Sequence, residues 1–418
     1  MFDQSFNIKT LAYQLKKSDF FKYKEIRNED IKEKALKEAD ELAKTSLLAH
    51  KLRSNRLKGK VVFQLDGLSQ ELVFRKLNNN LEYCLKIKYS NRSDIVDNIK
   101  NILSEGNPYT VYRLDVKSFY ESFDIEFVKN KINSELYLSN ETKKIVSNVL
   151  NEHLASGYSG LPRGLATSAI ISEYMMKDFD LFIKRKIGVF YHARFVDDIF
   201  IVTNGEDDDV KFVSEVQKNL PKGLQLNKKK KSIKKISNKV SPNKGNALDH
   251  ILEVDFLGYR FTVHEPQYDK SIKNSFRDIQ IDISGDKVRK IKTRLVCAFK
   301  DFNDSKDFSL LVNRLRFLSS NFSVLDAERE RKRLSGIFHN YHMTHVERSK
   351  SLVELDLFIK KAVLSGTGKV FSDSYVSLTQ MQKYRLLKFS FKRGFQNCHY
   401  VYFKADKLKE IQECWKYV

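Results

Sequence analysis

The apolar positions of the chain follow two different periods, which predicts a fold of mixed helices and strands. Residues 22–55 carry apolar side chains at the three- and four-residue spacing of an amphipathic helix: Ile31, Ala35, Ala39 and Leu42. The same spacing predicts helices over 91–103 and 165–186, and it dominates after about residue 284. We therefore expect the last third of the chain to be almost wholly helical.

The centre of the chain has the shorter period of β-strands. TVYRLDVKSFY (110–120) begins as an apolar strand, and GVFYHARFVDDIFIV (188–202) reads as two strands of a hairpin with an Asp pair at its turn. A helix is predicted over 207–220, followed by a basic strand, GLQLNKKKKSI, and a further strand, DFLGYRFTV. This order predicts an α+β sheet with helices on one face.

Composition narrows the range of partners. The 418 residues include 75 Lys and Arg against 53 Asp and Glu, a formal net charge of +22, which favours a polyanion and nucleic acid first. An anionic membrane surface is the alternative, but we see no apolar run of membrane length and no secretion signal, and we expect a cytoplasmic protein without membrane contact. Four widely spaced cysteines are expected to stay reduced.

Three aspartates stand where apolar strands end. Asp115 closes the run 111–114, and Asp197 and Asp198 interrupt the apolar hairpin. Like charges flanked by apolar residues destabilise a fold unless a cation compensates them, which indicates a metal site. A polar hairpin turn without metal is the simpler alternative, because Asp is common in turns.

Five segments in this order resemble the motifs of reverse transcriptases. YRLDVKSFYESFD resembles motif A, GLPRGLATSAIIS motif B, RFVDDIFIV motif C, GLQLNKKKKSI motif D and FLGY motif E. The resemblance covers 111–263 and is most like the bacterial defence-associated, unknown-group class. It implies an RNA-directed DNA polymerase that adds dNTPs to a primer with two Mg²⁺ ions.

The resemblance also implies roles for single residues. Asp115 and Asp197 would bind both metals, with Val116 beside them, and Asp198 would complete the acidic cluster. Tyr120 takes the place of the aromatic gate that excludes a 2′-hydroxyl, with simple core packing as its alternative. Lys230 would assist pyrophosphate departure, although its lysine neighbours are rivals for that role.

Further residues are expected to contact substrate. Gly164 permits a tight turn before the motif B helix, and Arg163 stands where the family often has Gln, which leaves its template contact open. Arg75, Lys88 and Arg92 are candidates for the triphosphate, against the alternative of a solvated basic surface. Phe195 stands where the family usually has Tyr. Gly258 resembles the primer-grip glycine, with a bulge in a strand as the alternative.

Together these features predict a right-hand polymerase. We place an N-terminal helical extension at 1–55, fingers at 56–110, a palm at 111–263, and a helical thumb with a basic C-terminal extension at 264–418. The class implies antiphage defence, an RNA template that is a dedicated non-coding RNA, and a nascent cDNA. A retron-type enzyme, an intron-maturase-like RNA-binding protein and a basic scaffold with an inactive palm are the alternatives; the oligomeric state is open.

Overall fold

The computed structural model describes residues 2–45, 52–57, 59–206, 208–236, 250–269, 274–326 and 331–416. The chain divides into two compact units: unit 1 comprises Met1–Asn91 and Tyr109–Lys235, and unit 2 comprises Arg92–Pro108 and Ile236–Val418. Among the described residues, no helix combines the length and the apolar character needed to cross a membrane.

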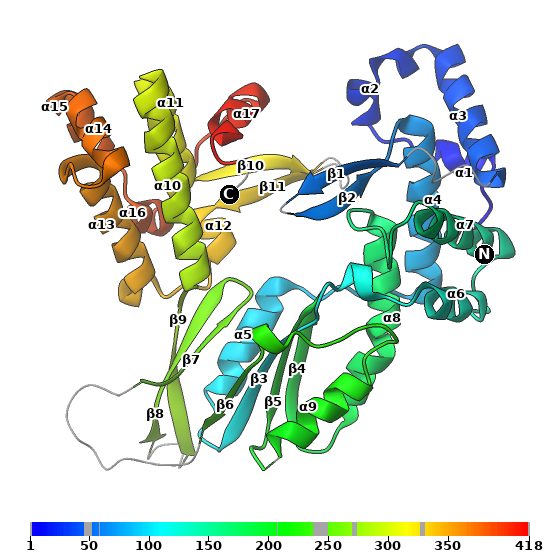
Figure 1. The fold of residues 1–418 in the computed structure, drawn as a ribbon, viewed down its shortest axis with the longest axis horizontal. Helices are drawn as coiled ribbons and strands as arrows, with labels where there is room; N and C mark the ends of the chain where they lie inside the picture. Colours follow the sequence, from blue (N-terminus) through cyan, green and yellow to red (C-terminus); the bar gives the residue numbers. More distant parts are fainter. Residues whose placement is uncertain are drawn as a thin grey trace. The chain divides into compact units, whose positions relative to one another are not determined.

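Unit 1 is built around a four-stranded sheet of order β4-β5-β3-β6 (Figure 1). The strands are β3 (Tyr109–Asp115), β4 (Val189–Phe195), β5 (Asp198–Thr203) and β6 (Ser232–Ile236). Both β3 and β5 are central strands, and nearly all of their residues are buried. The long runs of β-branched and aromatic residues in these two strands are what such a position requires.

Helices α8 (Ala166–Arg185) and α9 (Asp209–Lys218) cover one face of this sheet. Tyr112 of β3 packs against Phe212 of α9 with ring centroids 4.5 Å apart, and its hydroxyl donates to Asp209. Tyr112 and Leu114 belong to one apolar core with the buried face of α8. Because strand side chains alternate, Arg113 and Asp115 lie on the opposite face. The predicted sheet with helices on one face is confirmed for these elements.

The remaining elements of unit 1 are mostly helices that pack on the same core. They are α1 (Ile8–Ala12), α2 (Asp19–Lys22), η1 (Lys24–Arg27), α3 (Glu29–Lys44), β1 (Arg53–Leu57), β2 (Lys60–Gln64), α4 (Leu68–Leu85), η2 (Tyr120–Ser122), α6 (Ile125–Asn133), α7 (Asn140–Ala155), α8 (Ala166–Arg185), α9 (Asp209–Lys218) and η3 (Lys228–Lys230). Strands β1 and β2 form an antiparallel hairpin.

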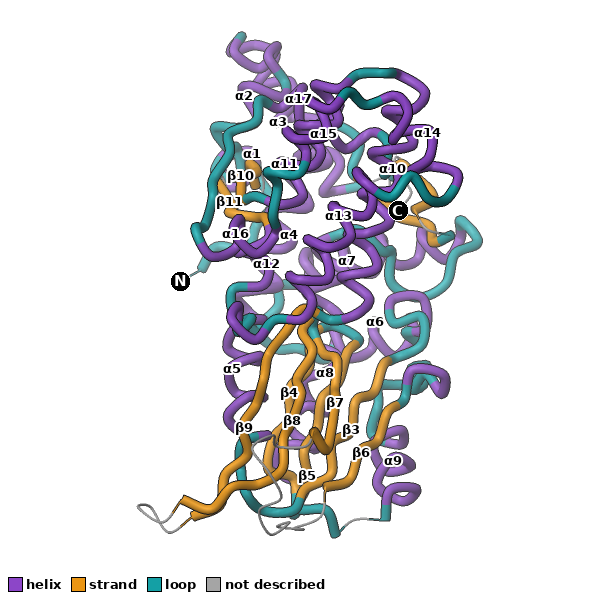
Figure 2. The backbone as a smooth tube through the Cα atoms, turned by 90° about the vertical axis from the view of Figure 1, so that its left-hand side faces the viewer, coloured by secondary structure: helices purple, strands orange, loops and turns teal. Residues whose placement is uncertain are grey.

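Unit 2 joins a three-stranded antiparallel sheet, β7-β8-β9, to a helical lobe with its own apolar core. Its elements are α5 (Arg92–Leu103), β7 (His250–Phe256), β8 (Tyr259–Asp269), β9 (Asn274–Ile283), α10 (Gly285–Ser305), α11 (Phe308–Ser319), β10 (Asn321–Asp326), β11 (Arg331–Gly336), α12 (Ile337–Tyr341), η4 (Val346–Arg348), α13 (Lys350–Leu364), α14 (Lys369–Ser377), α15 (Gln380–Leu386), α16 (Phe391–Gln396) and α17 (Ala405–Glu413). The β10–β11 hairpin packs on helices of unit 2, away from the three-stranded sheet β7-β8-β9 (Figure 1, Figure 2).

Three local expectations were wrong. The β10–β11 hairpin, which the sequence analysis did not predict, interrupts the stretch expected to be almost wholly helical, because Phe322 and Val324 alternate with polar residues and face the core. The segment before β6 is a 3-10 turn at Lys228–Lys230 rather than a strand. The segment DFLGYRFTV is not one strand, because Gly258 lies in the turn between β7 and β8 with φ +82°. This position excludes the strand bulge and leaves the turn that the family resemblance implies.

The two compact units do not follow the predicted domain boundaries. Helix α5, which we placed in the fingers, belongs to unit 2, and so do β7 and β8, which we placed in the palm. Strand β8 also continues to Asp269, past the predicted palm boundary at 263. The chain is rich in lysine from residue 222 to residue 244, where we expect either a solvated loop or contact with a nucleic-acid backbone, and 237–244 lie outside the described residues.

Candidate active site

The sheet of unit 1 brings the three aspartates together at one end of neighbouring strands. In the antiparallel pairing of β3 with β5, Asp115 is the register partner of Asp198. Directly opposite residues of an antiparallel pair have Cα atoms about 4.5–5.5 Å apart and point to the same face. Asp197 occupies the turn between β4 and β5, and its carbonyl accepts the backbone N–H of Val116 at 3.0 Å. Residues over 80 positions apart in the sequence thus meet at one sheet edge.

The turn that carries Asp197 is tight and needs support. Phe195 pairs with Asp198, so the loop has two residues, and Val196 has φ +60°, a conformation that is costly for a β-branched side chain. Arg194 donates to the Val196 carbonyl at 3.0 Å. Its guanidinium also binds Glu173 and Asp180 of α8, at 2.6 and 2.8 Å. The buried Arg194 therefore ties the strained turn to the helix behind the sheet.

Asp115 is buried, and its two carboxylate oxygens have different partners. Asn227 donates to one oxygen at 2.9 Å, and the Lys230 ammonium donates to the other at 2.7 Å. The backbone N–H of Asn227 also donates to the Asp115 carbonyl. The hydrogen bond and negative charge of Asp115 raise the pKa of Lys230, which keeps this lysine protonated at neutral pH. Of the four lysines in the run, Lys230 is the one that contacts the acidic group.

The electrostatics at the turn favour a bound cation. Burial raises the pKa of Asp197, and the charge of Asp115 raises it further. Burial likewise raises the pKa of Asp198, with the charge of Asp197 acting in the same direction. Carboxylate oxygens are the ligands that Mg²⁺ prefers, so the donor set fits such an ion. Within the described residues, however, no three acidic, histidine or cysteine side chains are already grouped as ligands of one metal.

The predicted gate, Tyr120, lies beside the same acidic group. The charge of Asp197 acts on Tyr120, whose pKa is raised mainly by burial, and also on Arg163. The Arg163 guanidinium lies over the Tyr120 ring, 5.0 Å from its centroid, and forms two hydrogen bonds with Glu121 at 2.7 and 3.0 Å. These contacts bring motifs A and B together at one place.

Two glycines of motif B allow this close approach. Gly160 has φ +65°, and a Cβ there would lie 2.2 Å from the Tyr120 carbonyl oxygen. Gly164 has φ +102°, and its Cβ would meet the Phe63 carbonyl oxygen of β2 at 2.6 Å. The Arg163 carbonyl accepts the Phe63 N–H at 2.7 Å. Gly164 thus seats the motif B turn on the β1–β2 hairpin, a role in addition to the predicted one.

The three triphosphate candidates have surroundings of different kinds, and Arg92 lies in the other unit from the aspartates. The Arg75 guanidinium is held by Asp19 and Glu71 on the helical layer of unit 1. Arg92 belongs to unit 2, where it donates to the Leu257 carbonyl and stacks on the Tyr259 ring. Lys88 is exposed in the segment that follows α4. The contacts of Arg75 and Arg92 stabilise their own units.

Several residues of the site escaped the sequence analysis: Asn227, Arg113, Glu121, Arg194, Glu173 and Asp180. Arg113, whose charge lowers the pKa of Asp198 against the effect of burial, was recognisable because it is two positions before Asp115 on the same face of a strand. No local signal marks Glu173 and Asp180 as partners of Arg194. Their pairing depends on how α8 packs against β4.

An acidic strand end, an Asp-bearing hairpin and a helix behind them define the palm of a nucleic-acid polymerase with the α+β right-hand fold. Residues 71–261 match the family described as "Reverse transcriptase (RNA-dependent DNA polymerase)". This part of the chain is therefore similar to reverse transcriptases. No curated protein sequence matches the chain significantly.

Solved structures also match. One is described as "Structure of telomerase from Candida albicans in complexe with TWJ fragment of telomeric RNA". The similarity covers 82% of this chain and 53% of that chain, at 13% identity and a TM-score of 0.31. This chain therefore spans about half the length of that protein, and the TM-score is too low to define a shared arrangement of the parts.

Proposed function

We propose that the protein is an RNA-directed DNA polymerase that extends a primer with dNTPs on an RNA template, using Asp115, Asp197 and Asp198. One observation carries the proposal: the β3–β5 register sets Asp115 opposite Asp198, next to the Asp197 turn, inside the segment that matches the reverse transcriptase family. Mg²⁺, when bound, would neutralise charge on the phosphate oxygens during nucleotidyl transfer.

The neighbouring residues would serve this reaction in separate ways. Asp115, Asp197 and Asp198, with the Val116 backbone beside them, would hold the two ions. Lys230 is protonated and hydrogen-bonded to Asp115, so it would move to the leaving pyrophosphate once a cation takes its place at that carboxylate. Tyr120 would exclude a 2′-hydroxyl by occupying its volume, with Arg163 fixing the ring from one side.

Primer extension tests the polymerase proposal. Purified protein is given an RNA template, a DNA primer, dNTPs and Mg²⁺, and the product length is measured. Wild type should extend the primer, and Asp197→Asn should extend it at least a hundredfold more slowly. The variant should keep its affinity for RNA, because the substitution leaves the basic surface of the protein unchanged. Undiminished extension by Asp197→Asn would refute the assigned site, and an RNA-dependent function that survives the substitution would favour a maturase-like protein.

We further propose that the enzyme acts in antiphage defence, in the cytoplasm, on a dedicated non-coding RNA. The support is the motif resemblance described above together with the net charge of +22. Sequencing the RNA and DNA that co-purify with wild type and with Asp197→Asn would identify template and product. One enriched RNA with matching cDNA only in wild type is expected, whereas cDNA joined to its own RNA would indicate a retron-type enzyme.

A further inference from the structure

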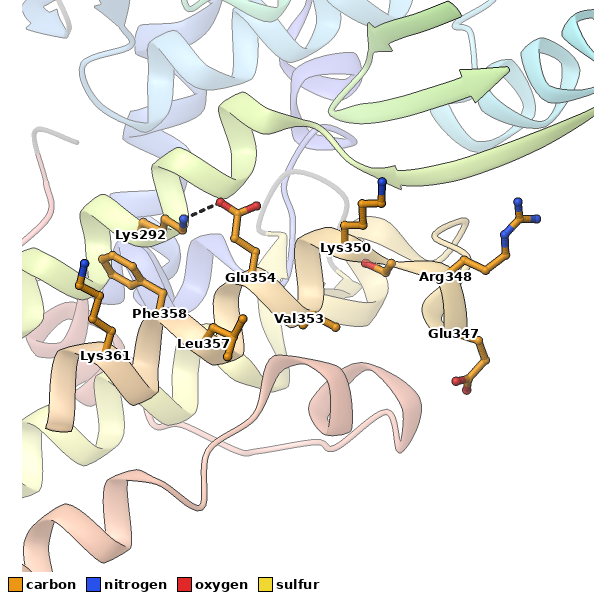
Figure 3. Close-up of a pocket in the computed structure, with 10 residues that line it drawn as sticks. Lys292, Glu347, Arg348, Lys350, Val353, Glu354, Leu357, Phe358 and Lys361 are labelled. Carbon is orange, nitrogen blue, oxygen red and sulfur yellow. Dashed lines mark hydrogen bonds and ion pairs between the residues drawn. The ribbon is translucent and has the colours of Figure 1, made fainter. Parts of the chain in front are cut away.

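A groove in unit 2, outside the segment that is similar to reverse transcriptases, has the features of a docking site. Its volume is about 770 Å³, and most of its lining comes from one face of α13. Lys350, Val353, Glu354, Leu357, Phe358 and Lys361 line it, and their spacing of 3, 4, 7, 8 and 11 residues places them on the same side of the helix. Figure 3 shows the apolar side chains between Lys361 at one end and Lys350 at the other.

Helix α13 has apolar side chains on two sides, one towards the core of unit 2 and one towards the groove. The opposite side, which includes Leu352, Leu355 and Ile359, is fully buried in the core of unit 2. On the groove side, Val353 is 44% exposed and Leu357 58% exposed. A helix at a protein surface normally has one apolar stripe and a polar opposite face. The second stripe therefore has the character of a contact surface.

Among the described residues, the acidic side chains of the groove are paired and two of its lysines are not. Glu354 is paired with Lys292 at 2.5 Å, and Glu347 accepts from Gln396 and contacts Lys392. Lys350 and Lys361 are exposed, and no carboxylate of the described residues lies within ion-pair distance of either. Eleven residues separate these two lysines, about 16 Å along a helix. The groove thus offers an apolar centre with a positive charge free at each end.

We propose that this groove binds an amphipathic helix of a protein partner that carries acidic residues about three turns apart and apolar residues between them. A helix lying in a groove buries apolar side chains at positions i and i+4, which matches the spacing of Val353 and Leu357. Acidic residues near its ends would pair with Lys350 and Lys361.

Two other occupants fit less well. A second copy of the chain, docked symmetrically through the same face, would set these lysines against each other, and like charges oppose such an interface. Nucleic acid would find aliphatic side chains at the centre. The aromatic ring there, Phe358, is half-buried against Phe371, and the Lys292 ammonium covers one of its faces, which makes the ring a poor platform for a base.

A designed peptide tests the proposal on the full chain. The probe is a fluorescent helical peptide of 15 residues with Glu at positions 1 and 12 and Leu at positions 4 and 8; its binding is followed by anisotropy. We expect micromolar affinity, weakened at least tenfold by Leu357→Glu and by the double change Lys350→Glu and Lys361→Glu. Val376→Glu on α14, where Val376 is 84% exposed and outside the groove, is the matched control and should bind as wild type does.

Charge exchange makes the test specific. A peptide with Lys at positions 1 and 12 should bind the Lys350→Glu and Lys361→Glu double variant and not wild type. No binding of the acidic peptide, equal binding to all variants, or equal loss in Val376→Glu would overturn the proposal. Dimerisation lost in Leu357→Glu, or displacement of the peptide by an RNA oligonucleotide, would assign the groove to a second copy or to nucleic acid instead.

Discussion

At the scale of single residues, the surroundings of Asp197 and Asp198 disfavour the charged form of both side chains. Burial raises the pKa of both side chains, and so does a neighbouring carboxylate, that of Asp115 for Asp197 and that of Asp197 for Asp198. A raised pKa means that the folded protein holds the proton more tightly than the unfolded chain does, so ionisation lowers stability at pH above the folded-state pKa. This cost disappears as pH falls through that pKa towards the ordinary value of Asp.

Replacing Asp198 by Asn should therefore stabilise the metal-free protein at pH 7 while abolishing polymerisation. We expect a gain on the order of 1 kcal/mol, because the amide removes a charge that burial and Asp197 oppose. Thermal unfolding from pH 4 to pH 8 in EDTA measures the gain, which should vanish towards pH 4. Mg²⁺ should then stabilise wild type more than the variant, since only wild type retains the full set of carboxylates. A destabilised variant at pH 7 would contradict the electrostatic account.

Tyr120 permits a second residue-scale prediction. Tyr120→Ala should raise ribonucleotide incorporation relative to deoxyribonucleotide at least tenfold, because the volume that would clash with a 2′-hydroxyl is removed. Tyr120→Phe keeps the ring and is the matched control, which should retain sugar discrimination. Competing rNTP and dNTP in primer extension measure the ratio. Unchanged discrimination in Tyr120→Ala would leave Tyr120 with the packing role that its contacts to Phe119 and Arg163 also permit.

At the scale of elements, the prediction from sequence succeeded where local pattern and packing agree. The helix α8 and the strands β3, β4 and β5 appear as expected, because their apolar periods match their burial. The amphipathic helix α3 is also present, but its buried positions are Leu36, Ala39 and Ala43, and Ile31 is exposed. Which side of a helix with small apolar residues turns inward is decided by the neighbouring elements, and no local pattern specifies it.

The link between β4 and α8 gives a prediction at this scale. Arg194→Lys should lower kcat at least tenfold with little change in the KM for dNTP, because a lysine cannot hold Glu173, Asp180 and the Val196 carbonyl together, and the Asp197 turn loses its support. Stability should fall by roughly 2 kcal/mol. Steady-state kinetics well below the melting temperature separate the two effects.

Another buried arginine provides the control for that experiment. Arg314 of unit 2 is fully buried and paired with Asp301, so Arg314→Lys should also destabilise the protein. Because Arg314 does not touch the turn, kcat should stay within about twofold of wild type. If both variants lost kcat in proportion to their stability, Arg194 would be a structural residue without a positioning role.

At the scale of the whole molecule, the two compact units divide the chain at other positions than the predicted domains do. The segment Arg92–Pro108 belongs to unit 2 although unit 1 precedes and follows it in the sequence. Arg92 explains this division in part, since its guanidinium donates to the carbonyls of Leu257 and Asn340. Contacts across more than 160 positions leave no local signal, so the predicted boundary at residue 110 followed the motifs instead.

The net charge of +22 predicts how RNA binding responds to salt. Phosphate contacts release counterions, so the logarithm of affinity should fall linearly with the logarithm of salt concentration, by about a thousandfold or more between 50 and 200 mM. Changing Lys228, Lys229 and Lys231 to Gln should reduce the slope by up to about 2, at roughly 0.7 for each single-strand phosphate contact. These lysines are exposed beside Lys230, which itself is occupied by Asp115.

A second triple variant tests whether the salt dependence of RNA binding depends on where the lysines lie or only on the total charge. Lys407, Lys409 and Lys416 are each paired with a nearby acid, and changing all three to Gln removes the same formal charge. If RNA follows the lysine run next to the aspartates, this control should keep the wild-type slope, because its lysines contact no phosphate. Equal slopes for the two triple variants, both below wild type, would mean that RNA responds to the overall field of the protein. Template would then be positioned by other residues, and the lysine run would serve the active site through Lys230 alone.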